Sequence, residues 1–99
     1  MAQPIYKVFI ARYTEAWHQL SKQEQDDLFA KNMAAFERLG CKFVLVCDSR
    51  WATDQWNFWG VSEYPDLESI QKYTEAMVEL NWFRYVDGVS VLGTALPPS

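Results

Sequence analysis

The chain has 99 residues and a mass of 11.6 kDa, and 49% of its residues are hydrophobic. This length predicts one small domain over residues 1–99, with no room for a second. The net charge of −4 and the lack of a run of Lys or Arg argue against nucleic-acid binding. No segment approaches the ~20 apolar residues that cross a bilayer, and the N-terminal residues do not resemble a signal peptide. We therefore expect a cytoplasmic protein that binds neither nucleic acid nor a membrane.

Clear start and stop signals mark the first two expected elements. Residues 5–13 are rich in β-branched and aromatic side chains, which predicts a strand. A helix is expected over 22–39, because Ser21 and Glu24 have the spacing of a capping box. Gly40 follows this helix and is a typical left-handed stop.

The rest of the chain adds three strands and one helix. Strands are expected over 41–48 and about 55–63, joined by a polar turn, and a helix over 66–80 begins at a capping aspartate. The segment that follows is a loop or an extra turn, a final strand covers about 86–94, and prolines leave 95–99 as a tail. The order β-α-β-β-α-β predicts an α+β, ferredoxin-like fold with a four-stranded antiparallel sheet.

The cysteines and short motifs carry no metal or nucleophile signal. Cys41 and Cys47 lie in one expected strand, ~20 Å apart and beyond disulfide reach. Two thiols without CxxC spacing predict no zinc site. The sequence also has no GxSxG, no Gly-rich loop and no HExxH. We expect two reduced cysteines, no metal and no cofactor.

Both faces of the expected sheet are apolar. Side chains two apart share a face, so Phe43, Leu45 and Cys47 are expected to oppose Val44 and Val46. The two helices of this topology cover only one face. About 500 Å² of bare apolar sheet leaves on the order of 12 kcal/mol of transfer free energy unrealised. We therefore expect a homodimer with its sheets packed face to face. The alternative is a monomer shielded by its C-terminal tail.

The order of elements, the apolar strands and the length resemble the dimeric α+β barrel superfamily. A local pattern made of Trp17, Leu20, Ser21, Glu24 and Leu28 resembles the start of the first helix in small, uncharacterised darcynin-like members. The closing sequence YVDGVSVLG is similar to their final strand. The resemblance implies two sheets packed in a homodimeric α+β barrel.

The superfamily contains several activities. It includes cofactor-free quinone-forming monooxygenases, muconolactone isomerases, haem-degrading enzymes, haem-dependent peroxidases, chlorite dismutases and ligand-sensing modules, and many of the enzymes hold a pocket between sheet and helices. The haem-degrading branch uses an Asn on the first strand, a Trp on the third and a His on the second helix. Trp56 or Trp59 matches that Trp, but the first expected strand has no Asn and the second expected helix has no His. The resemblance therefore argues against haem degradation.

The candidate ligand-binding residues combine rings with a few polar groups, as small-molecule sites do. Trp56 and Trp59 supply apolar surface, Asn57 an orienting amide, and Tyr73 a phenol. Arg12 can bind the carboxylate or phenolate of a substrate. We expect some of these five residues to line a closed cavity of a few hundred Å³ in each subunit.

Two residues are weak candidates for catalysis. His18 is the only side chain whose ordinary pKa lies near neutrality, although a surface histidine in a polar connector is the commoner outcome. Arg12 is expected in a covered layer, where its donors need an anion. An ion pair with Glu63 or Asp87 would satisfy it without a substrate.

Two functions are consistent with the sequence. The first is a small-molecule-binding dimeric α+β barrel protein, with cofactor-independent monooxygenase or isomerase chemistry on a small aromatic substrate as its candidate activity. The alternative is a non-catalytic protein-interaction or ligand-sensing module. For that module, Trp51, Trp82 and Tyr85 are expected to form an exposed anchor surface.

Overall fold

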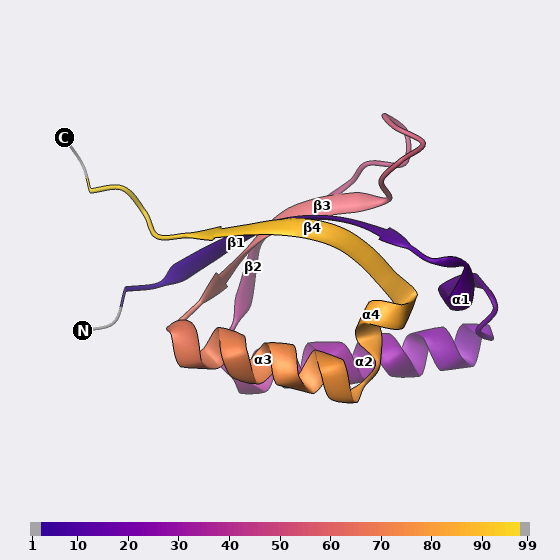
Figure 1. Ribbon diagram of the computed structural model, residues 1–99, viewed down its shortest axis with the longest axis horizontal. Coiled ribbons are helices and arrows are strands. Elements are labelled where there is room, and N and C mark those ends of the chain that lie inside the picture. Colours follow the sequence, from indigo (N-terminus) through magenta and orange to yellow (C-terminus); the bar gives the residue numbers. More distant parts are fainter. Residues whose placement is uncertain (1–2, 98–99) are drawn as a thin grey trace.

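A four-stranded antiparallel sheet carries its helices on one face only (Figure 1). The computed structural model describes residues 3–97. The sheet order is β2-β3-β1-β4, with the strands β1 (Ile5–Tyr13), β2 (Lys42–Asp48), β3 (Phe58–Tyr64) and β4 (Val86–Gly93). The helices are α1 (Glu15–His18), α2 (Lys22–Arg38), α3 (Leu67–Glu79) and α4 (Trp82–Tyr85). This order and the two long helices confirm the predicted α+β, ferredoxin-like fold.

The ends of the long helices follow the local sequence signals. Ser21 and Glu24 form a complete capping box, because the Ser21 hydroxyl accepts from the Glu24 N–H at 3.1 Å and the Glu24 carboxylate accepts from the Ser21 N–H at 2.9 Å. Gly40 has a φ of 77°, which is the left-handed conformation expected after the helix. Asp66 caps α3 by accepting from the Ser69 N–H at 2.8 Å. These predicted boundaries are confirmed.

Other boundaries differ from the expectation. Residues 15–18 form the helix α1 where a polar connector was expected, because Trp17 is buried and stacks on Tyr13 with 4.6 Å between ring centroids. β3 begins at Phe58 rather than near residue 55. The segment before β4 forms the short helix α4, which is the extra turn of the two alternatives expected there. Residues 94–97 have no regular structure, and the rest of the expected tail lies outside the described residues.

One strand departs from the expected alternation of faces. The register pairs Phe43 with Ser62 but Leu45 with Val61, so a bulge lies between Phe43 and Leu45. A bulge adds one residue to a strand and inverts the alternation beyond it. The prediction that Phe43 and Leu45 share a face is therefore wrong: Phe43 faces the helices, where it stacks on Phe36 at 4.5 Å, and Leu45 faces away.

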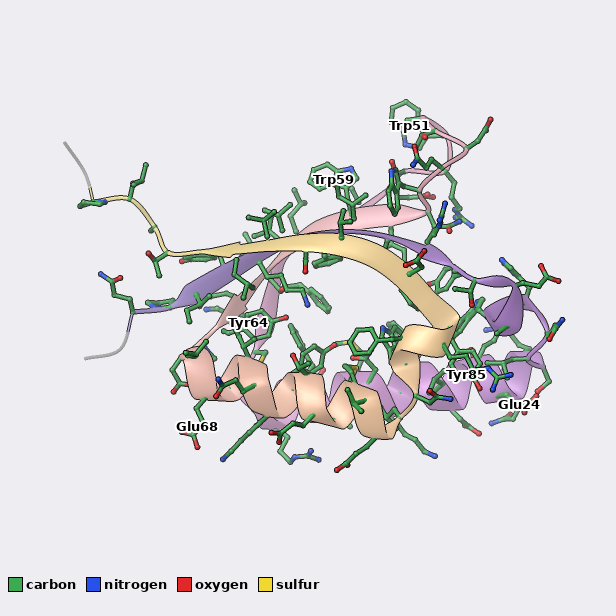
Figure 2. All side chains as sticks on the ribbon, viewed as in Figure 1. Glu24, Trp51, Trp59, Tyr64, Glu68 and Tyr85 are labelled. Atoms are coloured by element: carbon green, nitrogen blue, oxygen red, sulfur yellow. The ribbon has the colours of Figure 1, made fainter. Side chains whose placement is uncertain are left out.

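The core fills one end of the space between the sheet and the helices. Phe36 from α2, Cys41, Tyr64 from β3 and Ile70 from α3 form a buried cluster. Tyr64 points from the sheet toward the helices in Figure 2 and is only 1% exposed. The cluster fixes both long helices against the same end of the sheet.

The face of the sheet opposite the helices is also apolar, as predicted. We call it the outer face. Leu45, Val61, Val8 and Val91 lie side by side across all four strands in one row. Val8 is 44% exposed and Val91 71% exposed. Trp59 points away from the helices on this face (Figure 2). Among residues 3–97, no helix is long and apolar enough to cross a membrane.

Candidate ligand-binding site

A partly open cavity of about 780 Å³ lies between the sheet and the helices. Four small residues on the inner face of the sheet border it: Ala11, Ser62, Gly88 and Ser90. Because their side chains are short or, at Gly88, absent, they leave the space beneath the sheet unfilled beside the core. The expected cavity was closed, whereas the observed one is open to solvent on part of its surface.

Aromatic and aliphatic side chains form most of the cavity wall. Phe9 and Phe58 contribute from the sheet, with their ring centroids 6.2 Å apart in an edge-to-face arrangement. Phe29 and Met33 contribute from α2, and Trp82 contributes from α4. A wall of this composition favours a flat, apolar ligand.

Two hydrogen-bonded pairs lie at the core end of the cavity. The Tyr73 hydroxyl donates to Asn32 Oδ1 at 2.6 Å, and the Ser62 hydroxyl donates to the Tyr64 oxygen at 3.1 Å. Burial raises the pKa of both Tyr73 and Tyr64. Both phenols are therefore neutral at physiological pH.

An ion pair between Arg50 and Asp48 and the amide of Asn57 lie at the opposite end of the cavity. Arg50 donates from Nε and Nη2 to the Asp48 carboxylate at 3.0 and 2.9 Å, which lowers the pKa of Asp48 to about 2. Asn57 Oδ1 accepts from the Tyr13 N–H at 2.9 Å. The Asn57 backbone N–H donates to the Ala11 carbonyl at 2.9 Å, so the loop before β3 is attached to the end of β1.

Lys7 is a cavity residue that the sequence analysis did not select. It lies on the inner face of β1, opposite Ser62 on one side and Leu92 on the other. Burial lowers the pKa of its ammonium group. The sequence contains a signal for this position, because Lys7, Phe9 and Ala11 are spaced two apart in the expected strand and therefore share a face.

The five predicted ligand-binding residues do not form a single site. Asn57 and Tyr73 line the cavity. Arg12, Trp56 and Trp59 are not among the lining residues. Arg12 and Trp59 project from the outer face, and the Arg12 guanidinium lies 5.4 Å from the centre of the Trp56 ring.

The catalytic candidates also lie outside the cavity. Arg12 pairs with Asp87 at 3.2 Å, which is one of the two pairings that the sequence suggested. Its side chain is 46% exposed in the single chain. His18 is exposed and contacts the edge of the Tyr13 ring at 6.5 Å between centroids. Within residues 3–97, no three His, Cys, Asp or Glu side chains are grouped as a metal site would require.

The rings of the expected anchor surface are separated. Trp51 is 86% exposed in the loop between β2 and β3, which rises on the outer side of the sheet. Trp82 is half-buried and lines the cavity. Tyr85 is half-buried on the helical side of the molecule (Figure 2). The three rings therefore do not share one surface.

Comparisons with known proteins define the fold. Neither a family model nor a curated protein matches the chain. The RPA0582 protein of unknown function from Rhodopseudomonas palustris, in its methylated form, superposes with a TM-score of 0.66 at 17% identity, covering 99% of this chain and 84% of that one. SnoaB, a cofactor-independent oxygenase from Streptomyces nogalater, superposes with a TM-score of 0.55 at 16% identity, covering 98% of this chain and 97% of that one.

A longer protein contains the same unit. A mutant chlorite dismutase from Candidatus Nitrospira defluvii superposes with a TM-score of 0.73 at 14% identity, and the match covers all of this chain but 43% of that one. At these identities the likeness concerns the fold. The chain has the ferredoxin-like fold of the dimeric α+β barrel proteins.

Proposed function

We propose that this chain is a small-molecule-binding protein whose ligand is a small aromatic compound held between the sheet and the helices. The observation that carries this proposal is the cavity of about 780 Å³. Its volume falls within the range of about 300–1,000 Å³ that is usual for ligand pockets. Its lining, mainly rings with a few hydrogen-bonding groups, has the composition of such pockets.

The proposal includes a reaction class, cofactor-independent monooxygenation of the aromatic compound, with isomerisation as the second candidate. SnoaB, which is an oxygenase of this kind, supports it because the two chains match over nearly their full lengths. The neutral hydroxyl of Tyr73 and the apolar wall would desolvate a phenol and hold it in one orientation. Oxygen uptake with dithranol and no added cofactor measures this activity directly.

A substitution that fills the cavity tests binding. Ser90 lies on the edge strand β4 and borders the cavity, so Ser90→Trp places an indole in the ligand space. We expect it to weaken binding of 2-naphthol, measured by isothermal titration calorimetry, by at least about tenfold. Leu92→Trp is the matched control, because Leu92 is on the same face of β4, is 49% exposed and does not line the cavity.

Two results would contradict this assignment. One is the absence of binding by the wild-type protein across a panel of one- to three-ring aromatic compounds. The other is equal binding by wild type, Ser90→Trp and Leu92→Trp, which would place the ligand elsewhere. Native mass spectrometry of freshly purified protein adds an independent readout, since a co-purified ligand would appear as an added mass.

We further propose that two copies pack through their outer faces as a homodimer. A row of apolar side chains crosses all four strands of this face, and no helix covers it in the single chain. The fold is that of the dimeric α+β barrel proteins, which supports a second copy of this chain as the cover. A cytoplasmic location is also proposed; the free thiols of Cys41 and Cys47 support it.

A further inference from the structure

One charge that lines the cavity has no counter-charge. Four charged residues border the cavity: Lys7, Asp48, Arg50 and Asp87. The Asp87 side chain lies opposite Arg12 in register and projects with it from the outer face. Asp48 is paired with Arg50 at 2.9 Å, and Asp87 is paired with Arg12 at 3.2 Å. Among residues 3–97, no carboxylate forms an ion pair with Lys7. The cavity therefore has one uncompensated positive charge.

The other titratable groups of the wall supply no negative charge to offset it. Burial raises the pKa of Tyr13, Tyr64 and Tyr73, so all three phenols are protonated at neutral pH. Cys47 is among the residues that border the cavity, but its register with Trp59 places its side chain on the outer face. The wall thus contributes neutral polar groups and the Lys7 ammonium group, besides the Asp48 carboxylate that Arg50 already binds.

The position of Lys7 is set by the sheet. β1 is a central strand and pairs with β3 on one side and β4 on the other, so the backbone at Lys7 is fixed by both neighbours. Phe9 lies two residues further along β1 on the same face as Lys7. Its ring packs edge-on against Phe43, with 6.1 Å between the ring centroids. Burial removes hydration from the Lys7 ammonium group without supplying a counterion, which is unfavourable until an anion arrives.

We propose that the ammonium group of Lys7 binds the anionic oxygen of the ligand, so that the natural ligand is an aromatic acid, either a carboxylate or an ionised phenol. This inference rests on the proposed function and specifies its substrate class. The rings of the wall bind the aromatic body, and Lys7 selects the charge. Charge-assisted hydrogen bonds are stronger than neutral ones, so the Lys7 ammonium group accounts for most of the preference for an anionic ligand over a neutral one.

The experiment compares two ligands of the same shape. 2-Naphthoate and 2-naphthamide differ in charge but share the ring system, and both are titrated by calorimetry into wild type and Lys7→Met. We expect wild type to prefer the naphthoate by about tenfold or more, and Lys7→Met to lose that preference while still binding the amide. Lys7→Arg keeps the charge and is expected to retain the preference.

A third probe identifies the anionic group. 2-Naphthol is neutral in water at neutral pH, so the appearance of the naphtholate absorption band on binding to wild type, but not to Lys7→Met, would assign an ionised phenol. Preference for naphthoate without that band would assign a carboxylate. Either outcome supports the proposal.

The failures of the two proposals are distinguishable. If wild type and Lys7→Met bind naphthoate and naphthamide equally well, the role of Lys7 is overturned and the small-molecule site stands. If no aromatic compound binds to wild type, both proposals are overturned. Unchanged amide binding by Lys7→Met shows that the variant is folded, so a loss confined to the anion is not a loss of structure.

Discussion

The two cysteines, Cys41 and Cys47, lie in different surroundings. Cys41 is 6% exposed and lies in the core cluster, where burial and the nearby Asp66 carboxylate raise the pKa of its thiol to about 11. Cys47 is half-buried in β2 and pairs in register with Trp59 on the outer face. Residue type alone does not distinguish the surroundings of these two cysteines.

The raised pKa of Cys41 predicts a loss of stability at high pH. Below the ordinary thiol pKa of 9.0, Cys41 is protonated in both the folded and the unfolded chain, so stability is unaffected. Between that value and about 11, the unfolded chain releases the proton and the folded chain retains it, which favours unfolding. We expect the free energy of unfolding to fall by up to about 2 kcal/mol more in wild type than in Cys41→Ala over this range.

Urea unfolding at several alkaline pH values measures this difference. Lys7 also titrates there, but it is common to both proteins and cancels in the comparison. The Cys41 thiolate contributes to the raised pKa of Tyr64 and Tyr73, so the difference between the two proteins includes this coupling. Parallel pH profiles for wild type and Cys41→Ala would show that the thiol ionises as readily in the folded chain as in the unfolded one.

The sequence identified some residues of the candidate site and missed others. Tyr73 was selected as a phenol and lines the cavity, whereas Arg12 was expected in a covered layer and its side chain is 46% exposed in the single chain. Lys7 was missed because a lysine in a strand suggests a solvated position. Its register partner Ser62 and the cavity that it borders depend on elements whose position relative to β1 only the folded structure provides.

At the scale of elements, the capping box at the start of α2 is the strongest local signal. Both of its hydrogen bonds are present. We expect Ser21→Ala to lower the free energy of unfolding by about 1 kcal/mol, because it leaves the Glu24 N–H without its side-chain acceptor. Ser21→Gly is the matched variant and is expected to cost only about a few tenths of a kcal/mol. Urea unfolding of wild type and the two variants measures these free-energy differences. An alanine variant as stable as wild type would show that the cap contributes nothing.

The element boundaries that failed depend on contacts between distant residues. β3 begins late because Asn57 bonds to the end of β1 through both its backbone and its side chain. The bulge in β2 inverts the alternation beyond Phe43, and no local signal marks it. α1 exists because Trp17 stacks on Tyr13. Helix caps are local hydrogen bonds and were predictable, whereas these features are tertiary.

The same sheet serves two purposes at the scale of the whole molecule. Its inner face combines small residues with a core at one end, which leaves the cavity, and its outer face presents apolar side chains to solvent. The cavity lies on the inner face of the sheet and the proposed interface on the outer face, so we expect each copy in the proposed homodimer to contain its own site. Dimerisation and ligand binding are therefore separable by mutation.

A charge at the centre of the outer face tests the dimer. Val8 on the central strand β1 lies between Val61 and Val91 in the apolar row, so Val8→Lys would bury an unpaired ammonium group in the interface. We expect wild type to sediment at twice 11.6 kDa and Val8→Lys at 11.6 kDa, with the dimer dissociation constant raised by at least about a hundredfold. Val78→Lys is the control, because Val78 is 62% exposed on α3, on the helical side.

The separation of the two faces makes this experiment more specific than a test of folding. In the single chain Val8 is 44% exposed, so a lysine there can reach water and the monomer should fold. The Val8→Lys monomer should then still bind an aromatic ligand, and its unfolding midpoint should lose the dependence on protein concentration that a dimer has. A wild-type protein that sediments as a single subunit at every concentration would leave the outer face uncovered and overturn the homodimer, while the cavity on the other side of the sheet would be unaffected.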